Sequence, residues 1–248
     1  MINASIHLEG LSEELKTRIE PFVHDLQHAG IAGLRAVYLT GPAVRGEFSE
    51  ANPELQLLVV ADVFETPVLD AIAALGNQYG KKGIRAPLML TPEYLGNARD
   101  AFPMELFDLK HNHHHLLGDD PLADIAIDSG HLRLQCEREL RLVGLQLRQA
   151  YLRSAGDDAW FTGWLYDVVP DVFPALRATL HLLGGDTRAG NTEILSLLNS
   201  VTGIDMQPVT MVWESHKNGK PPKGNLAAEL YEQWRSAFAA LVERVDAL

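Results

Sequence analysis

Residues 34–61 read LRAVYLTGPAVRGEFSEANPELQLLVVA, and this stretch decides the fold of the first half of the chain. Two apolar runs, residues 34–40 and 55–61, flank a polar segment that begins with Gly41-Pro42. Both runs have the length and apolar content of strands, and a glycine–proline pair is typical of a turn. The second run is almost unbroken, which indicates a strand with both faces covered. We therefore expect two buried strands connected through this turn.

Helices and a further strand surround this stretch. Ser12 is a good helix N-cap, and Thr66 and Thr91 are each followed by a proline suited to the first helical turn. Apolar residues recur at helical spacing after Ser12 and Thr66. The expected elements are helices over residues 12–27 and 66–80, a strand over 84–91, and a helical segment over 91–110 with a break near Pro103. Such alternation predicts an α/β domain.

Strand patterns stop after about residue 121, and helical spacing takes over. The expected helices cover residues 132–151, 174–183, 192–201 and 226–248, with a loop over 213–224. We therefore expect an N-terminal α/β domain over residues 1–125 and an all-α helical bundle over residues 126–248.

The composition fits a soluble cytoplasmic protein. The chain has 248 residues with 33 acidic and 21 basic side chains, a net charge of −12, and one cysteine, Cys136. Residues 1–127 carry 9 basic and 18 acidic side chains, which leaves 12 and 15 for the rest. This charge argues against nucleic-acid binding, because affinity for phosphate backbones comes from lysine and arginine. No leader-like or membrane-spanning segment is predicted.

Residues 39–47 (LTGPAVRGE) and 54–60 (ELQLLVV) resemble the signature of the nucleotidyltransferase superfamily. In that family a strand ends in Gly-Ser, an Arg-Gly pair follows, and two aspartates alternate on the next strand. The order of elements over residues 30–110 is also similar to that family. The resemblance implies Mg²⁺-dependent nucleotidyl transfer. It places the catalytic positions at Glu54 and Gln56, and the cofactor-binding turn at Gly41, Pro42, Arg45 and Gly46.

The catalytic positions depart from the family pattern. Mg²⁺ requires hard, charged oxygen ligands, and carboxylates two residues apart on a strand point to one face. Glu54 keeps its charge on a longer arm, whereas Gln56 offers a neutral oxygen, and residues 84–91 contain no acidic side chain. Pro42 has neither the amide nor the hydroxyl of the family's serine, although proline also suits a first helical turn. We expect no metal site; the nearby Glu47, Glu50 and Asp62 do not occupy the alternating position.

The histidines are the next candidates. His111 and His115 would lie on one face of a helix and could hold Zn²⁺ or Ni²⁺, with His113, His114, Asp119 and Asp120 close in sequence. The spacing is not typical of a metal site. We therefore favour an exposed polar helix end for residues 111–115.

The helical half resembles the HEPN or substrate-binding bundles that accompany nucleotidyltransferase domains. Arg177 and His181 are closer together than the Arg and His of RNA-cleaving HEPN proteins, and we expect His181 to pack or to complement a helix C-terminus. An aromatic stretch before Pro170 could line a pocket between the domains, although core packing is the commoner role. Its residues are Trp160, Phe161, Trp164 and Tyr166.

Three hypotheses follow. The first is a catalytically degenerate nucleotidyltransferase-fold protein, without a cofactor, that binds or regulates through an unknown small molecule or protein partner in an interdomain cleft. The alternative is an active Mg²⁺-dependent enzyme that uses Mg²⁺ and a nucleoside triphosphate, and transfers the nucleotide to an unknown acceptor through Glu54. A third, purely structural hypothesis is a homodimer formed through the helical half.

Overall fold

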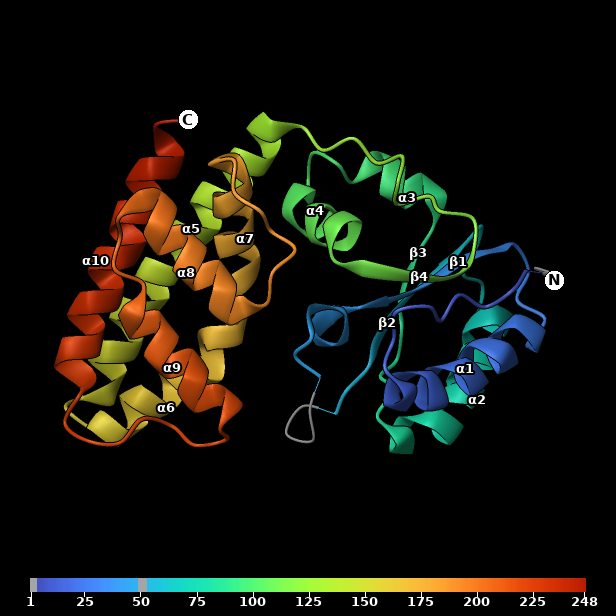
Figure 1. Ribbon diagram of the computed structural model, residues 1–248, viewed down its shortest axis with the longest axis horizontal. Helices are drawn as coiled ribbons and strands as arrows, with labels where there is room; N and C mark the ends of the chain where they lie inside the picture. The colour runs from blue at the N-terminus through green and yellow to red at the C-terminus, as the bar shows by residue number, and fades with distance from the viewer. Residues whose placement is uncertain (1–3, 49–52) are drawn as a thin grey trace. The chain divides into compact units, whose positions relative to one another are not determined.

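The chain folds into two compact units, which the computed structural model describes over residues 4–48 and 53–248 (Figure 1). The first unit contains Met1–Arg99 and Leu109–Ala126, and the second contains Asp100–Asp108 and Ile127–Leu248. A mixed four-stranded sheet with helices forms the first unit, and the second is all helical. The predicted fold class is confirmed. Among the described residues, no helix combines the length and hydropathy that crossing a membrane requires.

The sheet has the strand order β3-β2-β1-β4. Its strands are β1 (Leu34–Thr40), β2 (Gln56–Ala61), β3 (Leu88–Leu90) and β4 (His113–Gly118). β1 is antiparallel to both β2 and β4, whereas β2 and β3 are parallel. The predictions for β1 and β2 are confirmed, with Leu55 forming a single bridge to Ile84. β3 is shorter than predicted, since Pro87 has no amide with which to extend the ladder.

β4 corrects the sequence interpretation of the histidines. His113, His114 and His115 pair with Thr40, Leu39 and Tyr38 of β1, so the expected helix ends at His111 and a strand follows. The buried Leu116 and Leu117 anchor this strand in the sheet. The pattern was misleading because three consecutive histidines carry no alternation of apolar and polar residues.

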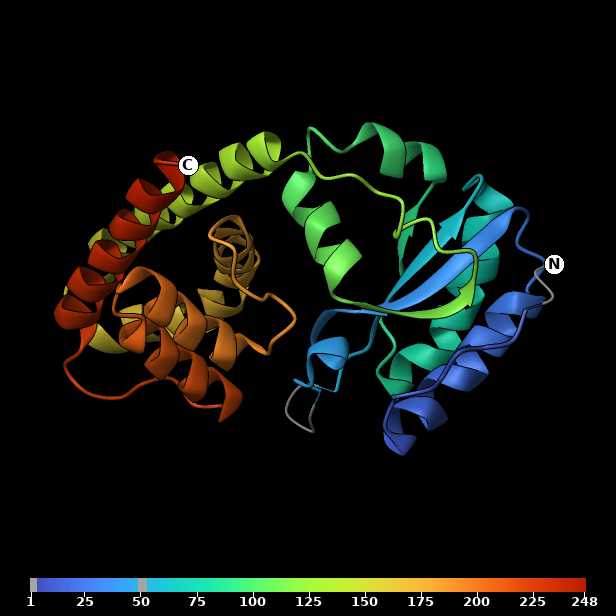
Figure 2. The same cartoon turned by 45° about the horizontal axis from the view of Figure 1, so that its top comes forward.

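Two helices lie side by side along one face of the sheet (Figures 1 and 2). These are α1 (Glu13–His28) and α2 (Thr66–Tyr79). They bury one set of alternating strand residues, including Val37, Leu57 and Val59. The opposite set, Ala36, Tyr38, Leu58 and Val60, is fully buried as well, which confirms a sheet covered on both faces.

The capping predictions are correct for two helices and wrong for the third. The hydroxyls of Ser12 and Thr91 accept amide hydrogen bonds at the starts of α1 and α3 (Pro92–Asn97). α2 begins one residue early, because Glu65, in an extended conformation, is the N-cap and Thr66 is already helical. Pro67 still lies in the first turn, where its missing amide costs no helical hydrogen bond.

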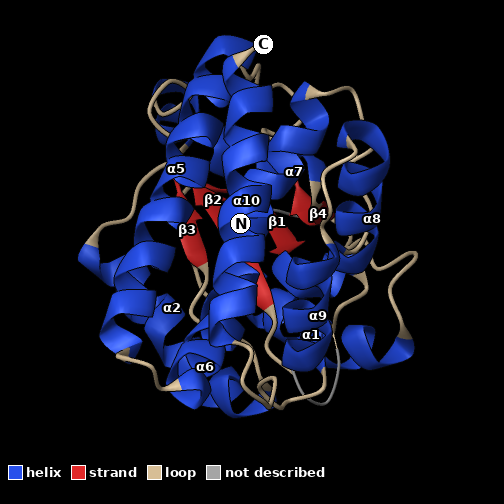
Figure 3. Cartoon of the chain, turned by 90° about the vertical axis from the view of Figure 1, so that its left-hand side faces the viewer, coloured by secondary structure: helices blue, strands red, loops and turns tan. Residues whose placement is uncertain are grey.

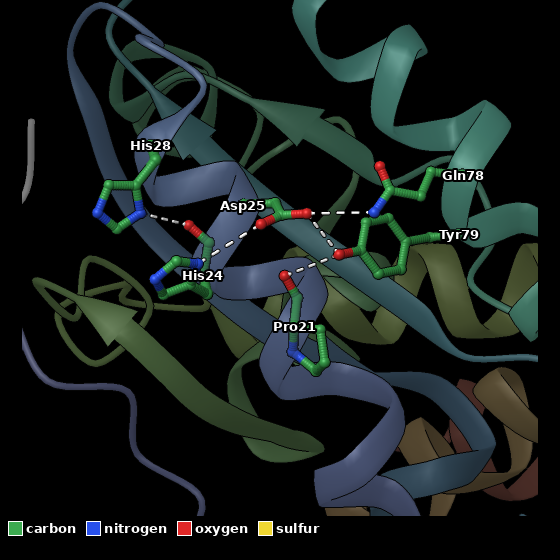
Figure 4. A network of polar contacts seen from close by, with 6 residues as sticks. All are labelled: Pro21, His24, Asp25, His28, Gln78 and Tyr79. Atoms are coloured by element: carbon green, nitrogen blue, oxygen red, sulfur yellow. Dashed lines mark hydrogen bonds and ion pairs between the residues drawn. The ribbon is translucent and has the colours of Figure 1, made fainter.

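Asp25 and Tyr79 join α1 to α2 (Figure 4). The buried Tyr79 hydroxyl lies 2.5 Å from Asp25 Oδ2 and 3.1 Å from the Pro21 carbonyl oxygen. This hydrogen bond is the main reason that the pKa of Asp25 is below its usual value, and burial raises the pKa of Tyr79 to about 12. The pair therefore stabilises the helical layer as long as Asp25 is ionised.

The second unit is a helical bundle in which the long α5 and α10 pack against each other (Figure 3). The helices are α5 (Ser129–Ser154), α6 (Asp158–Val168), α7 (Phe173–Leu182), α8 (Asn191–Thr202), α9 (Gln207–Lys217) and α10 (Ala227–Asp246); residues 103–108 of α4 (Pro103–His111) also belong here. The predicted helices are confirmed, but α6 and α9 were not predicted. The predicted loop over residues 213–224 is wrong at its start, because α9 continues to Lys217 and buries Trp213.

Arg177 of α7 holds the connection between α7 and α8. Its guanidinium is fully buried and donates hydrogen bonds to the carbonyl oxygens of Thr187 (3.0 Å) and Ala189 (2.7 Å) and to the Asn191 side chain. His181 is exposed, and its ring contacts Phe107. Arg177 therefore points into the protein and is engaged with backbone, whereas His181 lies at the surface.

We expect Arg177→Met to lower the free energy of unfolding by about 3 kcal/mol or more, since it removes charge-assisted bonds and leaves buried carbonyls without donors. Urea denaturation measures this loss. Arg148→Met, at an exposed position of α5, is the control and should change stability by less than about 0.5 kcal/mol. Equal effects of the two substitutions would contradict a structural role for Arg177.

We expect Tyr79→Phe to lower stability by roughly 1 kcal/mol at pH 7, through loss of the bond to Asp25. The folded-state pKa of Asp25 is lowered, so this stabilisation is present above the unfolded pKa and is lost as the pH falls through the folded value. The difference between the two proteins in urea denaturation should therefore shrink between pH 5 and pH 2. Tyr231→Phe, which changes a tyrosine in the helical unit, should show no such pH dependence.

Candidate functional site

The motif turn begins where β1 ends, and the pairing of Thr40 with Gln56 places it beside β2. Gly41–Arg45 form a short 3₁₀ helix, with Gly41 at φ +71°. A Cβ atom on Gly41 would collide with the side-chain oxygen of Gln56, so this amide packs directly against the glycine backbone. Pro42 lies in the first turn of the 3₁₀ helix, where its missing amide is tolerated, as the sequence suggested.

Glu54 forms an ion pair with Arg85. The bridge between Leu55 and Ile84 brings the two neighbouring residues together, and Glu54 Oε2 lies 2.6 Å from Arg85 Nη2. Both side chains are about half exposed, so solvent screens the pair. The sequence shows that residues 84–91 contain no carboxylate, but Arg85 was not predicted as a partner for Glu54. The available signal was the position of Arg85 at the start of a predicted neighbouring strand.

Arg45 faces another carboxylate in the turn. Its Nε lies 3.7 Å from Glu47 Oε2, and both side chains are less than a fifth exposed. The Glu47 amide donates to the Pro42 carbonyl oxygen, and Gly46 ends the 3₁₀ helix at φ +70°. The conformation of the turn thus directs Arg45 towards Glu47.

The other acidic residue considered near the motif is paired as well. Asp62, just beyond β2, accepts a hydrogen bond of 2.7 Å from Arg35 Nε. Glu50 lies outside the described residues. Within residues 4–48 and 53–248, no three histidine, cysteine, aspartate or glutamate side chains are grouped to hold a metal ion. Glu47, Glu54 and Asp62 therefore each have an arginine as neighbour.

A cavity of about 500 Å³ adjoins the turn, and we call it the turn cavity. Residues 10–12, 14 and 15 at the start of α1 form one wall, and the turn forms another through Ala43, Val44, Gly46 and Phe48. His113 and His114 complete the lining from β4. Of the four turn residues predicted to bind a cofactor, only Gly46 borders this cavity.

The histidines of β4 are held by hydrogen bonds to backbone carbonyls. His113 Nδ1 lies 2.7 Å from the Leu109 oxygen, His114 Nε2 3.1 Å from that of His7, and His115 Nε2 3.1 Å from that of Leu117. A carbonyl can only accept, so each of these ring nitrogens is the donor. Because residues 113–115 are extended, the helical spacing that would have joined His111 to His115 does not exist.

Some residues of the aromatic stretch of α6 line a cavity, and others pack in the core. Trp160 and Trp164 border a cavity of about 420 Å³ that lies within the helical unit, lined also by α5 and by residues 171–175. Phe161 is fully buried, and the Tyr166 ring contacts His216. Phe161 thus has the core role that was named as the commoner one, whereas Trp160 and Trp164 line a cavity of the second unit.

Cys136 has a structural role. It is fully buried in the helical core, and burial raises its pKa to about 11. Its sulfur lies 3.1 Å from Thr179 Oγ1. A thiol with a raised pKa is a poor nucleophile at neutral pH.

No protein-family model and no curated protein sequence matches this chain. Among solved structures, it is similar to spectinomycin adenyltransferase AAD(9) from Enterococcus faecialis, determined with ATP and spectinomycin. The identity is 12% and the TM-score is 0.37, over 82% of this chain and 97% of that chain.

We expect Gly41→Ala to destabilise the protein more than Gly46→Ala. Both glycines have φ near +70°, which costs about 1–2 kcal/mol for alanine, but only at Gly41 does the added Cβ meet Gln56. Urea denaturation of both variants isolates this contact. In a Gln56→Ala background, the excess cost of Gly41→Ala should disappear, and an unchanged excess would show that Gln56 is not the obstacle.

Proposed function

We propose that this protein is a binding module built on a nucleotidyltransferase-like domain, and that it does not catalyse Mg²⁺-dependent nucleotidyl transfer. The ion pair between Glu54 and Arg85 carries the proposal. Of the two predicted catalytic positions, only Glu54 is charged. A metal site needs further negative charge beside it, but the neighbouring residue is an arginine.

The surroundings of the pair support the same conclusion. Gln56 offers a neutral amide, and its oxygen packs against Gly41. A Mg²⁺ ion at this position would have to displace Arg85 and tolerate its positive charge close by. A doubly charged ion and a guanidinium about 4 Å apart repel by roughly 8 kcal/mol at an effective dielectric constant of 20. This repulsion offsets part of the attraction between Mg²⁺ and the single glutamate.

The turn is also poorly equipped to hold a triphosphate. Pro42 has no amide to donate to a phosphate oxygen, and Arg45 is directed towards Glu47. The turn cavity nevertheless has room for a small molecule, and His113 and His114 offer polar groups at its border. We propose a small polar ligand without a triphosphate for this cavity. Three further predictions stay predictions: a ligand in an interdomain cleft, a protein partner, and a homodimer formed through the helical half.

The decisive measurement is calorimetric titration of the metal-stripped protein with ATP, GTP and CTP, each with and without Mg²⁺. We expect no Mg²⁺-dependent binding in the wild type, and no change in Glu54→Gln. Arg85→Ala frees the carboxylate and serves as the matched comparison, in which Mg²⁺ alone should bind more strongly than to the wild type, although weakly.

The competing hypothesis of an active transferase predicts the opposite pattern. Mg²⁺-dependent binding of a nucleotide by the wild type, abolished in Glu54→Gln, would overturn the proposal and justify a search for the acceptor. Binding without Mg²⁺ that is unaffected by Glu54→Gln would fit a non-catalytic nucleotide-binding module.

A further inference from the structure

A second cavity of the first unit, which we call the apolar pocket, lies between α2 and the segment before and within β3. Its volume is about 320 Å³. The lining residues are Phe22, Leu69, Ile72, Ala73, Gly76, Tyr79, Ile84, Arg85, Ala86, Pro87 and Met89. It shares no lining residue with the turn cavity. Cavities of this size with mostly apolar walls and few polar groups are typical small-molecule sites.

The deep wall of the pocket is fixed in place. Phe22, Tyr79 and Ile84 are buried, and the hydroxyl of Tyr79 is held by Asp25. Leu69, by contrast, is 37% exposed at the pocket, a considerable fraction for a leucine that borders a concave surface. The pocket therefore has a deep wall of buried side chains and also apolar surface that is in contact with water. A ligand that covers this apolar surface gains free energy from the hydrophobic effect.

Gly76 keeps the pocket open from the side of α2. It lies inside the helix, where glycine is less favourable than alanine, and a Cβ built on it would meet no atom within 4 Å outside its own helix. Packing within the unit therefore does not require a glycine here. The absence of a side chain leaves space that a ligand can fill.

Basic side chains lie at and near the pocket. Among the lining residues that the structure describes, Arg85 alone is charged, and Lys82 Nζ lies 4.7 Å from the centre of the Tyr79 ring. Lys81 is next to Lys82 in sequence, so three cations fall within five residues. They stand out because the first 127 residues carry twice as many acidic as basic side chains.

Arg85 can serve an anionic ligand while it remains paired with Glu54. A guanidinium has five N–H donors, and one carboxylate does not use all of them. Arg85 is about half exposed, so a ligand can reach it from solvent. Its planar group also suits a carboxylate, which it can bind through two parallel hydrogen bonds.

We propose that the apolar pocket binds a small monocarboxylate with a short apolar chain, the chain against Phe22, Tyr79 and Ile84 and the carboxylate at Arg85. This site shares no lining residue with the turn cavity, but it shares Arg85 with the ion pair on which the function proposed above rests. Charge selects an anion over a cation, and the apolar lining selects a hydrocarbon chain over a sugar or a nucleotide.

Calorimetric titration with three probes of equal chain length tests the proposal: sodium octanoate, 1-octanol and octylammonium chloride. We expect octanoate to bind at least tenfold more tightly than octanol, and octylammonium to bind least. Equal affinities of octanoate and octylammonium would refute the role of Arg85, and absence of octanoate binding would refute the site.

Two substitutions place the binding in the pocket. Gly76→Leu puts a side chain into the open space and should weaken octanoate binding at least tenfold. Gly144→Leu is the matched control. Gly144 is also inside a helix, and a Cβ on it would likewise meet no atom within 4 Å. Because Gly144 lies in α5, far along the chain from the pocket residues, its substitution should leave the octanoate affinity unchanged. Circular dichroism and a thermal melt of both variants confirm that they fold. Unchanged affinity in folded Gly76→Leu would overturn the assignment.

Arg85→Gln tests the effect of the positive charge on octanoate affinity separately from the effect of the pocket's shape. It keeps hydrogen-bonding capacity but removes the positive charge, so octanoate affinity should fall about fivefold or more while octanol affinity stays the same. A parallel loss for both probes would indicate collapse of the pocket and would contradict a direct contact between Arg85 and the carboxylate. The nucleotide titrations measure Mg²⁺-dependent binding, whereas these tests measure octanoate binding, so failure of one proposal is distinguishable from failure of the other.

Discussion

The antiparallel pairing of β1 with β2 is the constraint on which the motif region depends. It sets Thr40 opposite Gln56, so β1 ends where β2 begins and the chain must turn at Gly41. Only a residue that tolerates φ +71° and lacks a Cβ fits there, because the Gln56 amide occupies the adjacent space. The same register places Glu54 just outside β2, where the bridge from Leu55 to Ile84 supplies Arg85 as its partner. Backbone pairing thus decides which side chains meet at the motif.

Arginine–carboxylate pairs determine the electrostatics of this region. Glu47, Glu54 and Asp62 would be anionic ligands if they were unpaired, but Arg45, Arg85 and Arg35 lie beside them. The two exposed pairs, of Arg85 with Glu54 and of Arg35 with Asp62, add little to stability. Their larger effect is to lower the local negative potential that would attract a divalent cation, in a unit whose overall charge is strongly negative. The same arrangement leaves guanidinium groups at the surface, where they can meet small anions.

The sequence predicted the parts of the fold that local patterns determine. β1, β2 and the capped helices follow from apolar runs and from Ser12, Thr91 and Pro67, whose effects act over one helical turn. β4 was not predicted because its identity depends on pairing with β1, and His113–His115 have no strand pattern of their own. The absence of a carboxylate at Gln56 and in residues 84–91 could be read directly. The contact between Glu54 and Arg85 was missed because it depends on the parallel bridge between residues about 30 apart in sequence, for which the place of Arg85 in a predicted strand was the one available signal.

Arg85 connects the motif with the apolar pocket. Its guanidinium is paired with Glu54, and the same side chain forms the charged border of a cavity whose other lining residues carry no charge. A long, half-exposed arginine would otherwise sample many rotamers, and ordering it costs conformational entropy on ligand binding. The pair with Glu54 restricts that freedom in advance, so part of this cost is met by the folded protein itself. In this arrangement Glu54 acts as a positioning residue for the cation that borders the apolar pocket.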